Sequence, residues 1–334
     1  MPEPLIWLTE TEVVSLVKLD DAIVALEQGL RACAEGHGFN VPKALGGWGD
    51  VSSMHALGSG MPEAGYVGFK NWVNTKRGAT ALYVMFDATN GALVAVMEAA
   101  ALGQLRTSAI SGVATKWLSA RDAKDMALVG TGAQAVTQIA AINAVRPLER
   151  LRVFSPTPEK RRAFVETVRE RFDFDVVEAT SVAVATEGAA IVTLITRAAQ
   201  PFLDAGMLAK GAHLNAVGAI LPSNAEFNQN VFDRADVVAV DDLTNVQRAS
   251  REFIEYYEKG DHDWNSVRSL GDLIAKGETR PVGCDLSLFK AMGMGLSDLS
   301  VAVMALDRAR KAGCGRAIDH PVRAVPQWNE PVMP

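Results

Sequence analysis

Residues 126–135, Met-Ala-Leu-Val-Gly-Thr-Gly-Ala-Gln-Ala, carry the clearest structural pattern of this chain. A short apolar run stops at Gly130, and a helix-like run starts at Ala135 and continues to about Ala144. This is the pattern G-x-G-x-x-A at a strand-to-helix turn, the context that a dinucleotide-binding loop requires. Gly130 permits the tight turn, Gly132 lets the backbone approach a pyrophosphate, and Ala135 allows close packing of the helix on the strand. The stretch therefore predicts a dinucleotide site.

Strand and helix patterns alternate after this loop. The predicted strands are the apolar runs 126–130, 151–155, 174–178, 190–196, 212–218 and 236–241. The middle runs are nearly continuous, which suits strands that are covered on both faces of a parallel sheet. The segment 158–172 is typical of the helices between them. We therefore expect an α/β fold with a Rossmann-type, doubly wound parallel sheet.

The first part of the chain has a different pattern. Its predicted strands lie at 66–73, 81–87 and 92–98. The last two flank Ala88-Thr89-Asn90-Gly91, a turn sequence that favours an antiparallel hairpin. A predicted helix over 99–119 then leads to the dinucleotide strand. We expect residues 1–120, with 310–334 packing back on them, to form an α+β domain, and residues 121–309 to form the Rossmann domain.

Composition excludes several classes of function. The chain of 334 residues has a net charge of −6 and its 33 Lys and Arg are spread along the sequence, which argues against nucleic-acid or anionic-membrane partners. No run approaches the ~18 apolar residues of a membrane span, and the N-terminus lacks a secretory pattern. Cys33, Cys284 and Cys314 are far apart, and the five histidines show no ligand spacing. We expect free thiols, no metal site and a cytoplasmic location.

The end of the second nucleotide strand bears on the choice of cofactor. An NAD-selective site usually has a carboxylate there that bonds the ribose 2′-hydroxyl. Here the strand ends in Ser155-Pro156-Thr157-Pro158, without a carboxylate. Ser155 and Thr157, with Arg161 or Arg162 nearby, would accommodate a 2′-phosphate, unless these arginines only form a solvated helix face. The sequence favours NADP(H) and leaves NAD(H) open.

Three further segments carry a family resemblance. They are Gly65-Tyr66-Val67-Gly68-Phe69-Lys70, then Arg106-Thr107-Ser108-Ala109, and finally Leu288-Phe289-Lys290-Ala291-Met292-Gly293-Met294-Gly295 followed by Asp298-Leu299. With the dinucleotide loop, in this order and spacing, they resemble the ornithine cyclodeaminase/mu-crystallin family over about residues 10–312. The resemblance implies a homodimer in which the first domain binds substrate and mediates dimerisation.

The resemblance also implies the roles of particular residues. Lys70 and Arg106 would hold the carboxylate of the substrate, and a cationic pair with a two-pronged arginine suits a small anion. Leu102 and Leu105 place Arg106 on a largely buried helix, where an unpaired charge is costly, so a ligand or an acidic partner is expected. The implied cofactor contacts are Thr107, Gly130, Gly132, Ala133, Gln134, Ser155, Thr196, Val217, Gly218, Ala219 and Ala291.

Two departures from the family pattern narrow the function. Ile220 stands where cyclodeaminases carry an Asp that acts as acid and base. Isoleucine cannot move a proton, and the loss of such a group costs ~10²–10⁴-fold in rate, so cyclodeamination is disfavoured. Ala44 stands where family members often carry an arginine for the substrate carboxylate, and Lys43 lies one position before it. We expect Lys43 to supply this charge with a different geometry.

Hydride transfer needs less from the protein than cyclodeamination, because positioning of an activated imine supplies much of the rate. We therefore expect an NAD(P)H-dependent imine or ketimine reductase, equivalently an amino-acid dehydrogenase, for a small 2-carboxylate substrate. Lys70, Glu226 or water would supply the proton. Two alternatives remain open: an ammonia-lyase of the cyclodeaminase kind that recycles bound NAD, and a mu-crystallin-like protein that only binds NADPH.

Overall fold

The apolar runs around Gly130 form a parallel sheet in this computed structural model, which describes residues 4–326 and 328. All of its strands pair in parallel. Side by side they are β13 (Val267–Ser269), β12 (Ala235–Val240), β14 (Leu286–Lys290), β11 (Ala212–Ala216), β10 (Ile191–Leu194), β7 (Asp125–Val129), β8 (Arg150–Phe154) and β9 (Asp175–Glu178). The chain winds outward in both directions from β7, so the expected doubly wound fold is confirmed.

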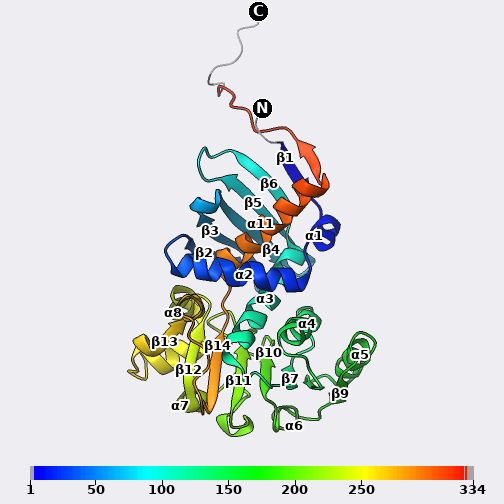
Figure 1. Ribbon diagram of the computed structural model, residues 1–334, viewed down its shortest axis with the longest axis vertical. Coiled ribbons are helices and arrows are strands. Elements are labelled where there is room, and N and C mark those ends of the chain that lie inside the picture. Colours follow the sequence, from blue (N-terminus) through cyan, green and yellow to red (C-terminus); the bar gives the residue numbers. More distant parts are fainter. Residues whose placement is uncertain (1–3, 327, 329–334) are drawn as a thin grey trace, which may run out of the picture.

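Helices cover this sheet in the lower half of Figure 1. They are α4 (Ala135–Val145), α5 (Pro158–Arg169), α6 (Val182–Thr186), α7 (Asn230–Arg234), α8 (Leu243–Ala249), α9 (Arg251–Phe253) and α10 (Leu270–Lys276). Ile139 of α4 and Val165 of α5 pack with Leu128 and Val153 of the strands beneath them in one buried cluster. The dinucleotide loop thus lies at the carboxyl edge between β7 and β10, the point at which the strand order reverses.

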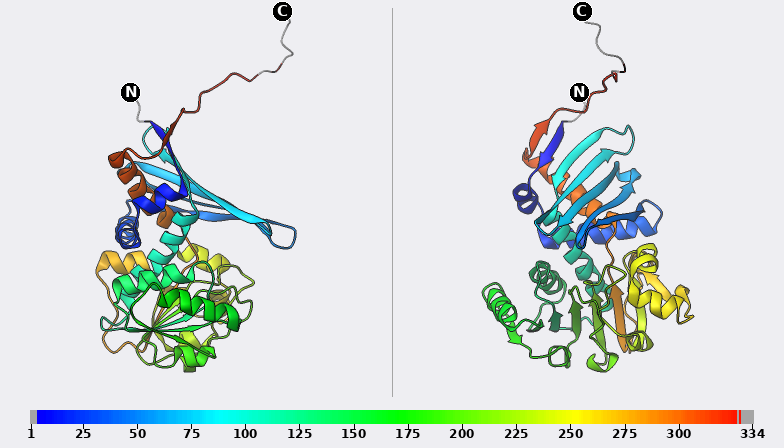
Figure 2. Two further views of the ribbon diagram at one scale, coloured as in Figure 1. Left: turned by 90° about the vertical axis from the view of Figure 1, so that its right-hand side faces the viewer. Right: turned by 180° about the vertical axis from the view of Figure 1, so that it is seen from behind.

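A second sheet lies above the first and is mostly antiparallel (Figure 1). Its strands, side by side, are β15 (Arg316–Ile318), β1 (Leu5–Leu8), β6 (Leu93–Glu98), β5 (Gly78–Asp87), β4 (Tyr66–Thr75), β3 (Ser52–Met61) and β2 (Phe39–Trp48). Only β1 and β6 pair in parallel. The expected hairpin at Ala88–Gly91 joins β5 and β6, and β2 to β5 extend outward as long hairpins in the left view of Figure 2.

Four helices accompany the upper sheet: α1 (Glu10–Leu16), α2 (Leu19–Ala34), α3 (Ala100–Leu118) and α11 (Gly295–Ala312). α3 runs from the upper sheet down to the lower one (Figure 1). One buried cluster contains Leu102 and Val113 of α3 together with Phe289 of the lower sheet and Leu299 of α11. The two halves of the molecule therefore share a continuous core.

The chain returns to the upper domain earlier than the expected residue 310. All of α11 packs against α2, α3, β3 and β4, so the boundary that we propose follows Met294. β15 then pairs with β1, which agrees with the expected return of the C-terminal segment. Residues 321–326 are exposed and run away from the sheet (Figures 1 and 2), so they do not pack back. Residues 327 and 329–334 lie outside the described part of the chain.

Two further sequence expectations concern the whole chain. No helix within residues 4–326 is long and apolar enough to cross a membrane. Cys33, Cys284 and Cys314 are free thiols. Neither observation assigns a cellular compartment, so the cytoplasmic location stays an expectation.

Candidate active site

A cavity of about 1070 Å³ lies between the two sheets. Its walls come from the carboxyl ends of β7, β8, β10 and β11, from α3, and from β4 and β5 of the upper sheet. This volume exceeds that of most single-ligand pockets and suits a dinucleotide with a small substrate. The expected cofactor residues that line it are Thr107, Gly130, Gly132, Ala133, Gln134, Ser155, Thr157, Thr196, Val217, Gly218 and Ala291.

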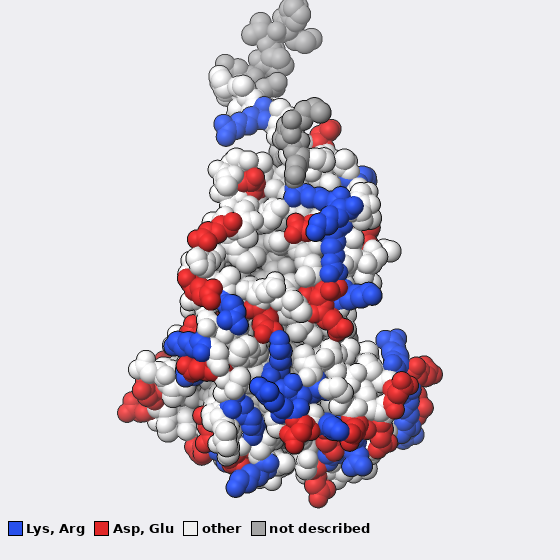
Figure 3. Space-filling model, in the orientation of Figure 1, with Lys and Arg blue, Asp and Glu red and all other residues white. Residues whose placement is uncertain are grey.

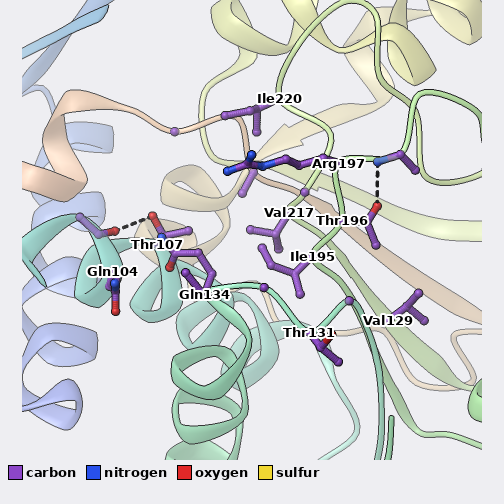
Figure 4. A pocket seen from close by; sticks show the side chains of 18 of the residues that line it. Gln104, Thr107, Val129, Thr131, Gln134, Ile195, Thr196, Arg197, Val217 and Ile220 are labelled. Carbon is purple, nitrogen blue, oxygen red and sulfur yellow. Dashed lines mark hydrogen bonds between the residues drawn. The ribbon is translucent and has the colours of Figure 1, made fainter. Parts of the chain in front are cut away.

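The dinucleotide loop has the geometry that its glycines predict. Gly130 adopts a φ of 113°, and a Cβ there would lie 2.6 Å from the carbonyl oxygen of Ile195. A Cβ at Gly132 would meet nothing within 4 Å, so the backbone at this residue borders open space in the cavity. α4 begins three residues later, and its N-terminus provides backbone N–H groups for an anion. Figure 4 shows Thr131 and Gln134 on this side of the cavity.

Lys70 and Arg106 meet in the cavity, one from β4 and the other from α3. The Lys70 Nζ atom donates to Asp298 Oδ1 at 3.0 Å, and Arg106 Nε lies 3.4 Å from the same oxygen. Asp298 is fully buried in the first turn of α11. It is the acidic partner that the sequence required for Arg106. Two cations share one carboxylate, which leaves a net positive charge for an anionic ligand.

Two glycines make room for these cations. A Cβ at Gly103 would lie 3.0 Å from Lys70 Nζ, and a Cβ at Gly293 would lie 3.0 Å from Arg106 Nη1. Gly293 has a φ of 84°, a conformation that side chains other than glycine rarely adopt. The small residues in the Leu288–Gly295 segment therefore position Arg106 by leaving space for it.

Burial lowers the pKa of the two lysines that lie near Trp72, Lys43 and Lys70. Desolvation, with Arg106 adding to it and Asp298 opposing it, lowers the pKa of Lys70 to about 8. Desolvation and Arg106 also lower the pKa of Lys43 to about 8. Lys70 Nζ lies 5.0 Å and Lys43 Nζ 5.8 Å from the centre of the Trp72 ring. The aromatic face compensates part of the burial of these ammonium groups.

Lys43 lies beside the cavity and is not part of its lining. It reaches Trp72 from β2, while His55 stacks on the same ring with 4.5 Å between the ring centres. Desolvation, Lys43 and Lys70 lower the pKa of His55 to about 4, so this histidine is neutral near pH 7. The expected contact of Lys43 with substrate therefore stays a prediction.

Arg161 does not face the cavity, contrary to the sequence expectation. Its guanidinium is held by Glu178 at 2.9 Å and donates to the carbonyl oxygen of Ser155 at 2.6 Å. The reason is helical spacing: Arg161 lies on the same buried stripe of α5 as Phe164, Val165 and Val168. Lys160, one residue earlier, is the cation of this helix that lines the cavity.

Glu226 is also placed differently from its expected role as a proton source. It is fully buried, and its carboxylate accepts hydrogen bonds from Thr196 N, Thr196 Oγ1, Gly218 N and Ala219 N at 2.7 to 3.1 Å. Both oxygens are therefore engaged behind the cavity wall. Ala219, expected to bind cofactor, is likewise buried outside the lining, because its N–H serves Glu226. Glu226 holds the ends of β10 and β11 together.

Asp241 plays a comparable part at the neighbouring strand β12. Its carboxylate accepts from Met292 N at 3.0 Å and from Gly293 N at 2.7 Å. Desolvation raises its pKa to about 6, although these hydrogen bonds favour the charged form. Glu226, Asp241 and Asp298 thus lie behind the cavity wall. Glu226 and Asp241 hold loops by hydrogen bonds, and Asp298 holds the two cations. Among the described residues, no carboxylate lines the cavity itself.

Sequence reasoning missed three charged residues. Asp298 lies in a family motif whose pattern does not show its role, although the buried position of Arg106 calls for an acidic partner of this kind. Lys160 could have been found from the α5 stripe, which points Arg161 inward. Arg197 lines the cavity after β10 from a loop, where no periodic pattern signals its direction.

Ile220 lines the same end of the cavity as Arg197 and Val217 (Figure 4). It brings an apolar side chain to the position at which the family resemblance implies an Asp in cyclodeaminases. No group of three or more His, Cys, Asp or Glu suited to a metal ion occurs within the described part of the chain.

The doubly wound fold and a dinucleotide loop that opens on the same cavity as a buried cationic pair define the class: a two-domain enzyme that binds a nicotinamide dinucleotide. The comparison of sequences is more specific. The ornithine cyclodeaminase/mu-crystallin family matches residues 5–313, and the chain belongs to this family.

Individual relatives agree with this assignment. The Delta(1)-pyrroline-2-carboxylate reductase of Bacillus cereus is 30% identical over 73% of this chain and 75% of its own. The fold matches that of the reductase of the same name from Thermococcus litoralis, solved with NADH and L-proline, with a TM-score of 0.88, 23% identity and coverage of 94% and 100%. It also matches an archaeal alanine dehydrogenase dimer with bound NAD, with a TM-score of 0.88, 24% identity and coverage of 95% and 99%.

Proposed function

We propose that this protein is an NAD(P)H-dependent oxidoreductase that reduces the C=N bond of a small imino carboxylate, or oxidises the matching amino acid. One observation supports this proposal above the others. The dinucleotide loop at Gly130 and the buried pair Lys70 and Arg106 line one cavity, so a hydride donor and a carboxylate would lie in the same space. The name of the Bacillus cereus relative makes a cyclic imine such as pyrroline-2-carboxylate the first candidate substrate.

The residues of the chain divide the work of this reaction. A nicotinamide dinucleotide, when bound, would supply the hydride that the imine carbon accepts. Gly132 and the N-terminus of α4 would hold its pyrophosphate. Arg106 orients the substrate carboxylate with a two-pronged hydrogen bond. Lys70, with its pKa lowered to about 8, both binds that carboxylate and is suited to give a proton to the imine nitrogen near neutral pH.

Cyclodeamination fits the cavity less well. That reaction requires a side chain that accepts and returns protons near the imine carbon. The family resemblance implies an Asp for this role, and here Ile220 stands at that position and lines the cavity. Since no carboxylate among the described residues lines the cavity, no replacement for the missing Asp is at hand. A protein that only binds NADPH would need no buried anion site, whereas Lys70, Arg106 and Asp298 form one.

The direct test is depletion of NADPH with a panel of imines. The panel consists of pyrroline-2-carboxylate, piperideine-2-carboxylate, and pyruvate or glyoxylate with ammonia or methylamine. We expect turnover of at least one of them. Binding of NADPH without oxidation across the panel would refute the proposal, and release of ammonia from ornithine without net cofactor use would favour the lyase.

We propose further that NADP(H) is preferred over NAD(H). Ser155, Thr157 and Lys160 line the cavity at the end of β8, where a carboxylate would otherwise repel a 2′-phosphate. Replacing Lys160 by Ala should raise the KM for NADPH roughly tenfold and leave that for NADH nearly unchanged, since an ion pair with a phosphate is lost. Arg162→Ala is the matched control, because this arginine of the same helix lies outside the lining. Equal effects of the two substitutions, or an NADH preference of the unsubstituted protein, would contradict the preference.

We also propose a homodimer formed through the outer face of the upper sheet. Phe39, Trp48, Met54, Phe69 and Val73 of β2, β3 and β4 are all between 41% and 56% exposed. The strand register puts Met54 opposite Val73. Phe69 lies four residues before Val73 on the same strand, opposite Gly58, and therefore on the same face. An apolar face of this kind is typical of a protein interface. The archaeal alanine dehydrogenase, which has this fold, is a dimer.

A further inference from the structure

Four cations line the cavity: Lys70, Arg106, Lys160 and Arg197. Lys70 and Arg106 are partly neutralised by Asp298 and together suit one substrate carboxylate. Lys160 stands beside Ser155 and Thr157 at the end of β8, where the adenosine end of the dinucleotide would lie. The pyrophosphate would lie at the N-terminus of α4. The substrate carboxylate, the pyrophosphate and the 2′-phosphate of NADP(H) that we assign to Lys160 leave Arg197 without an assigned partner.

The backbone on both sides of Arg197 is fixed. Thr196 N and Oγ1 donate to Glu226 Oε1 at 2.7 and 2.8 Å, and Ala198 N donates to Thr196 Oγ1 at 3.2 Å. The guanidinium of Arg197 makes no ion pair or hydrogen bond with the described residues. The backbone is already ordered, so a ligand that binds there has to order only the side chain.

Among the described residues that line the cavity with Arg197, none carries a negative charge. Figure 4 shows the Arg197 side chain extended toward Ile220, away from Thr131 in the dinucleotide loop. Ile220 is apolar, so it cannot form the ion pair that an acidic residue would form at this place. The charge of Arg197 therefore remains available to a ligand that enters the cavity.

We propose that Arg197 forms a subsite for a second anionic group of the substrate, a side-chain carboxylate. This inference rests on the proposed function and names the substrate class: a dicarboxylic imino acid, or in reverse an acidic amino acid such as aspartate. Its 2-carboxylate would bind Lys70 and Arg106, its second carboxylate would bind Arg197, and the C=N bond would lie between them. The atoms exchanged in the reaction, one hydride and one proton, stay the same.

Substrate pairs that differ in the second carboxylate test this subsite. kcat/KM is measured for NADP⁺-dependent oxidation of L-aspartate and its amide L-asparagine, and for NADPH-dependent reduction, in ammonia, of oxaloacetate and of pyruvate, which lacks the second carboxylate. The dicarboxylate of each pair is expected to exceed its partner roughly tenfold or more, since a hydrogen-bonded charge pair is at stake. In Arg197→Ala this ratio should fall toward one, and in Arg197→Lys it should be intermediate. Arg248→Ala, an exposed arginine of α8 outside the lining, should keep the ratio.

Two results would overturn the subsite. One is an unchanged acid-to-amide ratio in Arg197→Ala. The other is a rise in the KM for NADPH with the ratio unchanged, which would make Arg197 a ligand of the cofactor. A binding measurement separates this proposal from the proposed function: the protein with NADP⁺ bound is titrated with succinate and with succinamate. Stronger binding of succinate that is lost in Arg197→Ala supports the subsite even if no imine is reduced, and equal binding of the two refutes it.

Discussion

At the scale of residues, the sequence alone identifies the two cations of the proposed anion site but not their buried acidic partner. Lys70 and Arg106 share one carboxylate, that of the buried Asp298, so two positive charges face one negative charge and the site keeps a net positive charge. The resemblance pointed to both cations, because each lies in a motif. Asp298 was harder to interpret, since an acidic residue in the first turn of a helix is as often a surface group that favours the helix dipole. Asp298 meets its two partners only in the fold, because Lys70 lies on β4, Arg106 on α3 and Asp298 itself on α11.

The pH dependence of turnover tests the role of Lys70. Since burial lowers its pKa to about 8, Lys70 is charged below pH 8 and loses its proton above it. Both carboxylate binding and proton donation need the charged form. We therefore expect kcat/KM for the imine to fall about tenfold for each pH unit above 8, while the Kd for NADPH changes little.

The titration of neighbouring charged groups must be distinguished from that of Lys70 in this measurement. Arg106 on α3 and Asp298 on α11 face it, and Lys43 on β2 has a pKa lowered to about 8 as well. Lys43→Gln should therefore keep the fall above pH 8. A flat profile to pH 9.5 in the unsubstituted protein, or a fall that disappears in Lys43→Gln, would show that Lys70 does not control turnover.

At the scale of elements, the strands of the lower sheet were the most predictable. Runs such as Ile191–Leu194 are wholly buried, so nearly continuous apolar sequence is their signature. β2 and β3 were not predicted, because Pro42 and several glycines interrupt any alternation, and β2 is an edge strand that tolerates proline. β14 was missed because the sequence Leu286–Lys290 had been interpreted only as a motif.

The ends of β10 and β11 are joined by a contact that no pattern predicts. Glu226 closes both loops with four hydrogen bonds, and it does so from the fully buried position that raises its pKa. Gly218 is needed beside it, because a Cβ there would lie 2.4 Å from Glu226 Oε1. The sequence predicts this glycine as a cofactor contact, and in the fold it also leaves space for the Glu226 carboxylate.

Replacing Glu226 by Gln distinguishes positioning from proton donation. The amide NH₂ would face backbone N–H donors, which should lower the free energy of unfolding by about 1–3 kcal/mol for buried groups left without partners. The KM for NADPH should rise, because Thr196 and Gly218 line the cavity. Thermal denaturation and cofactor titration measure these effects. If kcat fell at least a hundredfold with stability and cofactor KM unchanged, Glu226 would be the proton source after all.

At the scale of the whole molecule, the cavity exists only because two domains with a shared core face each other. β4 and α3 bring the cations, and the lower sheet brings the dinucleotide loop. Sequence predicted both parts and their order along the chain. The boundary that we propose after Met294 differs from the expected residue 310, because the apolar stripe of α11 does not reveal which sheet the helix covers. The core shows that it covers the upper one.

Oligomeric state is a property of this upper sheet. A mass of twice the 35.7 kDa chain is expected in solution by light scattering. Val73→Asp, which puts a charge on the outer face of β4, should shift the mass toward that of one chain. Val184→Asp is the matched control, since this valine of α6 is also exposed but lies on the other domain. Loss of the dimer in both variants, or a monomer without any substitution, would refute the interface.

The central claim is that one cavity joins a hydride donor to a substrate held by Lys70 and Arg106. Its most direct test compares NADPH binding with turnover of pyrroline-2-carboxylate in Lys70→Ala and Arg106→Ala. Both variants are expected to bind NADPH with nearly unchanged Kd, while kcat/KM for the imine falls at least a hundredfold. Loss of NADPH binding in both variants, or turnover as fast as in the unsubstituted protein, would contradict it.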